Sequence, residues 1–101
     1  MRSRTDLSTI LHAIPGAKKV YFQPPTGLQM TYPCIVYKLV GIDDDFANNH
    51  RYAAMKKYEI IVIDEDPDST IYEKILELEY SSLRQIYVSD HLYHYVCNLY
   101  F

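Results

Sequence analysis

The chain has 101 residues, of which 49% are hydrophobic and 23% are charged, and its net charge is −3. This length suits a single domain, residues 1–101, with one modest core, and the net charge excludes the basic signature of a nucleic-acid-binding protein. No apolar stretch at the N-terminus is as long as the core of a signal peptide, and no apolar stretch approaches the length of a membrane span. Eleven tyrosines stand against three phenylalanines and no tryptophan. Because tyrosine suits surfaces that are buried in one state and wet in another, the composition indicates an assembling protein.

The beginning of the chain predicts a helix and then a short strand. Apolar residues recur at helical spacing over residues 5–14, and Thr5 or Ser3 can cap the start of this helix. Pro15-Gly16 predicts its end. The β-branched and aromatic residues of 18–23 then predict a strand, which ends before two successive prolines.

The middle of the chain predicts a long antiparallel hairpin. Residues 34–42 alternate as a strand does, residues 43–51 are polar and aperiodic as in a loop, and residues 52–66 return as a second strand. The run Ile60–Ile63 is apolar on both faces, which suits a central strand that is covered on both sides.

The last third predicts a helix and two strands. Residues 66–80 carry one apolar stripe, with Asp66 as the expected N-cap and Pro67 at the first helical position. Residues 83–89 and 92–101 read as strands on either side of a turn. The order α-β-β-β-α-β-β predicts an α+β fold, in which a mostly antiparallel or mixed sheet of about five strands packs two helices on one face.

Two helices on one face of such a sheet leave its other face open. We expect that face to carry apolar and tyrosine side chains, so it is the first functional clue. The C-terminal segment alternates as a strand does, which places Cys97 and His94 on opposite faces and argues against a metal site with His91. We expect no metal and no other cofactor.

Enzyme chemistry finds little support in the sequence. Cys97 with His94, or Cys34 with His12, could form a nucleophile and base, but both cysteines lie inside expected strands, where thiols are usually inert. The acidic run Asp43–Asp45 lacks the spacing of a calcium loop. We therefore expect a protein that is not an enzyme, with two reduced, buried thiols.

Partner contacts are expected at two places, the polar hairpin loop and the C-terminal strand. An exposed aromatic on an extended hairpin tip can anchor a partner, and the closing strand is dense in tyrosine. The candidate residues are Asp44, Asp45, Phe46, Asn49, Arg51, Tyr95, Tyr100 and Phe101.

The chain resembles the tail-completion, or tail terminator, proteins of long-tailed bacteriophages and prophages. The resemblance lies in "YPCIVYKL" (32–39), "KKYEIIVIDEDPDS" (56–69) and "LYHYVCNLYF" (92–101), so it covers most of the chain from Tyr32 onward. It identifies no individual functional residue.

This resemblance implies a virion protein at the head–tail junction, which is made in the host cytoplasm before assembly. Such proteins form a homo-hexameric ring on the head-proximal end of the tail tube, although a free subunit can be a monomer. The ring ends tube polymerisation and joins the head–tail connector or stopper protein. DNA passes through the ring with at most non-specific contact, and no membrane is involved. The alternatives are another connector component, a stopper or adaptor, or a small intracellular ligand-binding α+β domain.

Overall fold

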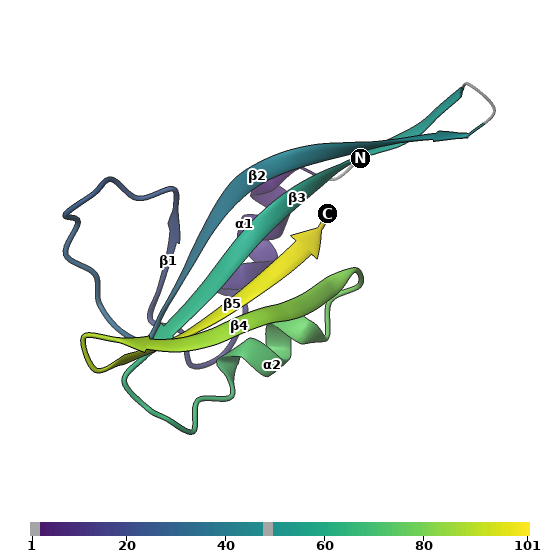
Figure 1. The fold of residues 1–101 in the computed structure, drawn as a ribbon. Helices are drawn as coiled ribbons and strands as arrows, with labels where there is room; N and C mark the ends of the chain where they lie inside the picture. Colours follow the sequence, from purple (N-terminus) through teal and green to yellow (C-terminus); the bar gives the residue numbers. More distant parts are fainter. Residues whose placement is uncertain (1–2, 48–49) are drawn as a thin grey trace.

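The computed structural model describes residues 3–47 and 50–101, and side chains outside residues 42–55 (Figure 1). Its helices are α1 (Arg4–His12) and α2 (Ile71–Leu76), and its strands are β1 (Lys19–Phe22), β2 (Cys34–Ala47), β3 (His50–Asp64), β4 (Ser81–Ser89) and β5 (Leu92–Tyr100). No helix within these ranges is long and apolar enough to span a membrane.

The five strands form one mixed sheet in the order β1-β2-β3-β5-β4. β1 runs parallel to β2, and the other neighbours are antiparallel. The predicted α+β fold, with a mixed five-stranded sheet and two helices, is confirmed. β1 and β4 are the edge strands, and β5 is internal because it lies between β3 and β4.

The core lies between the two helices and one face of the sheet. Leu7 and Leu11 of α1 and Ile71 and Ile75 of α2 are buried in one cluster with alternate residues of the three inner strands. Alternate residues of a strand share a face, so this cluster defines the covered face of the sheet. Its strand members are Ile35, Tyr37, Tyr58, Ile60, Val62, Tyr95, Cys97 and Leu99, followed by Phe101.

The first helix begins as predicted but ends sooner. Ser3 is its N-cap and forms a capping box with Asp6, in which each side chain bonds the other residue's backbone N–H. The helix ends at His12, two residues before the predicted boundary.

The prediction of a helix over residues 66–80 is wrong in its length and its cap. Asp64 and Asp66 accept hydrogen bonds from the backbone N–H groups of Asp66 and Asp68, at 3.0 and 2.9 Å. Such local bonds offer the backbone an alternative to a helix, so the segment turns before α2 begins. Thr70 is the N-cap, and α2 has only six residues.

The expected loop over residues 43–51 is also wrong, because most of it belongs to the two strands. β2 and β3 remain paired as far as Phe46 opposite Arg51 and Ala47 opposite His50. Beyond β1 and β5, this pair projects from the body as a two-stranded extension, and the molecule measures 49 × 24 × 23 Å (Figure 1). We call Gly41–Ala47 and His50–Lys56 the arm.

Candidate functional site

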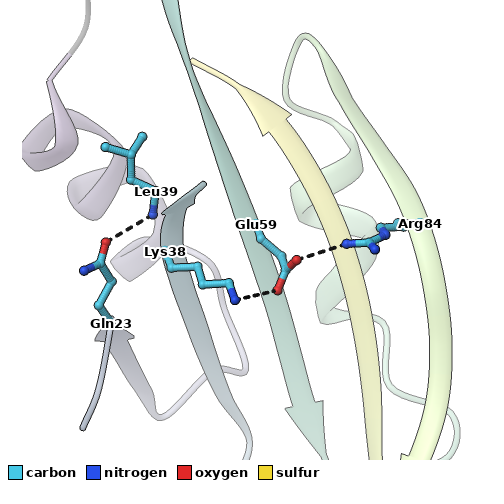
Figure 2. Close-up of polar contacts among 5 residues, drawn as sticks. All are labelled: Gln23, Lys38, Leu39, Glu59 and Arg84. Carbon is cyan, nitrogen blue, oxygen red and sulfur yellow. Dashed lines mark hydrogen bonds and ion pairs between the residues drawn. The ribbon is translucent and has the colours of Figure 1, made fainter. Parts of the chain in front are cut away.

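The open face of the sheet carries a row of charged side chains across three strands. Glu59 of β3 forms an ion pair with Lys38 of β2, with 3.6 Å between Oε1 and Nζ (Figure 2). Its other oxygen, Oε2, accepts a hydrogen bond from Nη1 of Arg84 in β4 at 3.1 Å. The Glu59 side chain is 15% exposed, whereas those of Lys38 and Arg84 are 54% and 57% exposed. The carboxylate therefore links β2, β3 and β4 from a largely covered position.

The rest of the open face mixes apolar and aromatic side chains. Val36, Ile61 and Val96 lie opposite one another in the register of three adjacent strands. At one end His94 stacks on Tyr87, with ring centroids 4.5 Å apart. The expectation of apolar and tyrosine side chains is therefore correct for these rows, but it overlooked the charged row at Glu59.

A shallow groove lies on this face beside the end of β1. It has a volume of about 470 Å³ and is lined by Gln23, Pro24, Val36, Lys38, Leu39, Glu59 and Ile61. The Gln23 Oε1 atom accepts a hydrogen bond from the Leu39 backbone N–H at 3.3 Å, which holds the segment after β1 against β2 (Figure 2). The groove combines apolar walls with one acidic and one basic side chain.

The edge strand β4 exposes a line of apolar side chains. Leu83, Ile86 and Val88 lie opposite buried or half-buried residues of β5 on the covered face, yet they are 40%, 51% and 59% exposed. They stay exposed because the short α2 does not extend over them. Edge strands usually carry a charge, a proline or a bulge that discourages pairing with another chain. β4 has a bulge near Arg84, but Gln85–Ser89 holds no charge and no proline.

The two cysteines are buried on different faces of the sheet. Cys97 belongs to the core under the helices, whereas Cys34 follows the alternation of Val36 and Lys38. Burial raises the pKa of each thiol to about 11, and the charge of Asp64 adds to the rise at Cys34. Both cysteines are free, so the prediction of two buried thiols is confirmed. His94 lies across the sheet from Cys97, and these two residues do not form a site together.

The predicted partner residues on the hairpin lie on the arm. Asp44, Asp45 and Phe46 are in β2 and Arg51 is in β3, so they belong to paired strands, whereas Asn49 falls outside the described residues. A projecting arm is a position from which a partner can be reached.

The predicted partner residues at the C-terminus have a different location. Tyr95 stacks on Tyr72 of α2, and Phe101 donates its backbone N–H to Lys56 O at 2.8 Å. Both side chains are buried in the core, at 4% and 6% exposure, so packing within the chain occupies them. Tyr100 is half-buried on the open face, with Lys57 Nζ 5.7 Å from its ring centre.

The sequence analysis missed the exposed apolar edge of β4. The uncharged run Gln85–Ser89 is visible in the sequence, but its exposure depends on the shortness of α2 and on its edge position.

Comparison with known proteins leaves the fold without an assigned family. No protein-family model matches the chain, and no curated protein matches it either.

Proposed function

We propose that this protein is a non-enzymatic structural protein of a phage virion, a tail terminator. Copies of it form a ring on the head-proximal end of the tail tube, which ends polymerisation of the tube and allows joining to the head connector. The proposal combines the resemblance of three segments with a small α+β fold and with surfaces suited to assembly.

The observation that carries the proposal is the arm. Two strands extend beyond β1 on one side and β5 on the other, so the arm is a two-stranded ribbon. An isolated two-stranded ribbon is at best marginally stable in water, and it gains most from pairing with or packing against another surface. A neighbouring subunit or the tube protein would provide that surface.

The exposed apolar residues of β4 support the same proposal. Monomeric proteins usually blunt or cover their edge strands, because an open edge is a template for strand addition. A subunit that becomes part of a ring can keep such an edge open until assembly covers it. The open face, with its charged row at Glu59, supports a role in packing rather than catalysis.

Electron microscopy of particles made with and without this chain tests the proposal. Without it, we expect tails of abnormal and variable length that do not join heads. Supplying the chain from a plasmid restores uniform tails. Uniform tails joined to heads in its absence would rule out the proposed role.

The groove beside Gln23 favours a second candidate, a small ligand-binding domain. Its volume and its mixed polar and apolar lining suit a small molecule. Light scattering separates the two candidates where high-mass species appear and grow with concentration, because only a ring-forming protein shows them. A ligand-binding domain keeps a constant low mass, and its thermal stability rises when the ligand is added.

A further inference from the structure

The open face of the sheet carries an excess of positive charge. Lys38 and Arg84 both contact Glu59, whose single charge balances only one of them. Lys57 shares the strand alternation of Glu59 and therefore lies on the same face. Across the described side chains of β2–β5 on this face, three cations thus stand against one carboxylate. Residues 65–80, which include α2 on the other face, hold six Asp or Glu and one Lys, so the two sides of the body carry opposite charge.

The groove beside Gln23 adjoins this charge. Lys38 and Glu59 line it together with the apolar side chains of Val36 and Ile61. Its volume of about 470 Å³ has room for an aromatic side chain. Lys38 is 54% exposed, so it can meet a carboxylate from outside the molecule. A surface that fits this face therefore combines acidic groups with an apolar or aromatic one.

The outer part of the arm has this composition. Within residues 43–51, the run Asp43–Asp45 is followed directly by Phe46. The same residues hold one basic side chain, Arg51, so three aspartates stand against one arginine. The charge of this end of the arm is opposite to that of the open face, and the attraction between unlike charges favours contact between the two surfaces.

The arm points away from the open face of its own molecule. Its strands continue β2 and β3 and stay paired as far as Ala47 opposite His50, so it projects beyond the body (Figure 1). Its length suits the face of another copy. Gly41–Ala47 spans roughly 20 Å at about 3.3 Å per residue. The row from Lys38 to Arg84 crosses the spacings from β2 to β4, roughly 14 Å at about 4.8 Å each, so the arm can lie across the whole row.

We propose that the arm of one copy lies across the open face of a second copy of this chain. The carboxylates of Asp43–Asp45 meet Lys38 and Lys57 of the second copy, and Phe46 enters its groove. The contact joins different surfaces of the two copies, which is the type of contact that builds rings or filaments. It deepens the proposed function by naming the surface of the neighbouring subunit that receives the arm, and it rests on that function only for closure into a ring.

Charge reversal on each surface tests this contact. Lys38→Glu reverses the face, and Asp44→Lys combined with Asp45→Lys reverses the arm. Each variant alone should self-associate about tenfold more weakly in analytical ultracentrifugation. An equal mixture of the two should associate about as strongly as the native chain, because each arm then meets a face of opposite charge. Lys74→Glu on α2, where the lysine has the same 54% exposure as Lys38, is the matched control and should change little.

Carbodiimide crosslinking, which joins carboxylates to amines in contact, measures the native chain itself. Isotope-labelled and unlabelled chains are mixed at about 1 mM, which populates even weak contacts. Mass spectrometry should find links between copies from Asp43–Asp45 to Lys38 or Lys57. Circular dichroism checks that the variants fold, and Lys57→Glu replaces Lys38→Glu if the latter does not.

Three results would overturn the inference. They are the absence of these links between copies, a reversed arm that self-associates as the native chain does, and a mixture of the two reversed variants that stays weak. The second result would assign the open face to a different acidic partner. Tail length plays no part in these measurements, so the inference can fail while the proposed function stands, and the reverse also holds.

Discussion

Single residues on the two faces of the sheet show how its polar and apolar groups are accommodated. On the open face, Glu59 is largely covered and accepts from both Lys38 and Arg84. On the covered face, the Tyr95 hydroxyl donates to Pro67 O at 3.3 Å, which gives a buried polar atom a partner. Burial raises the pKa of Tyr95, with nearby Tyr72 and Asp64 adding to the effect. Burial likewise raises the pKa of the Cys34 and Cys97 thiols.

Replacement of Glu59 should lower the free energy of unfolding, because it removes the ion pairs with Lys38 and Arg84. Glu59→Gln keeps the shape of the side chain but removes its charge, so we expect a loss of about 1 kcal/mol in unfolding free energy. The loss should shrink at high salt, because ions screen the row. Urea unfolding at low and high salt measures it. Glu79→Gln, at an exposed carboxylate, is the control, and an equal loss there would contradict the role given to Glu59.

The thiols should make stability depend on alkaline pH. Well below pH 9, which is the ordinary pKa of a thiol, each thiol is protonated in both states and contributes no slope. Between pH 9 and about 11 the unfolded chain releases the proton while burial keeps it on the folded chain. Stability should therefore fall as pH rises, by about 1.4 kcal/mol per pH unit for each thiol. Unfolding under reducing conditions should show a shallower slope for Cys97→Ala than for the native chain. Identical slopes would contradict the burial of this thiol.

Among the helices and strands, sequence periodicity predicted the elements that contribute buried residues to the core. It failed for segments whose structure does not depend on burying an apolar face. The first helix, the two central strands and the closing strand were predictable, because their buried residues recur at the period of the element. α2 was predicted too long, because Asp64 and Asp66 bond nearby backbone N–H groups. The outer part of the arm, within residues 43–51, was predicted as a loop, because that sequence is polar and the backbone pairing of two strands leaves no apolar pattern. The exposure of β4 was unpredictable, since it depends on the length of a different element.

The C-terminal strand should be essential for folding, because Leu99 within it and Phe101 directly after it belong to the core. Phe101→Ala removes a buried ring, and we expect a cost of about 3 kcal/mol. Tyr100→Ala, at a half-buried position, should cost less. Truncation after Asn98 also removes the fully buried Leu99 and should unfold the chain. Circular dichroism with urea titration compares the variants, and a folded truncated chain would refute this role.

The arm should be dispensable for folding but not for assembly. Replacing residues 44–54 by Asn-Gly joins the opposed Asp43 and Met55 through a two-residue hairpin turn. Because a lone ribbon adds little stability, unfolding free energy should change by less than about 1 kcal/mol. High-mass species in light scattering should disappear. Unchanged assembly by the shortened chain would exclude the arm from the interface.

The whole molecule is a small body with two uncovered features, the projecting arm and the edge of β4. The body buries one core between two helices and one sheet face, and its two sides carry opposite charge. A monomer gains nothing from a projecting ribbon and an unprotected edge, whereas a subunit with neighbours on both sides can use each of them.

The measurement that tests the account most directly is the length of tail tubes polymerised in vitro. Purified tube protein from the same phage or prophage is allowed to assemble, and this chain is added at increasing concentration. Electron microscopy should show shorter tubes, each with a ring of this protein at one end. Tubes that elongate to the same lengths with bare ends at every concentration would contradict the proposed function.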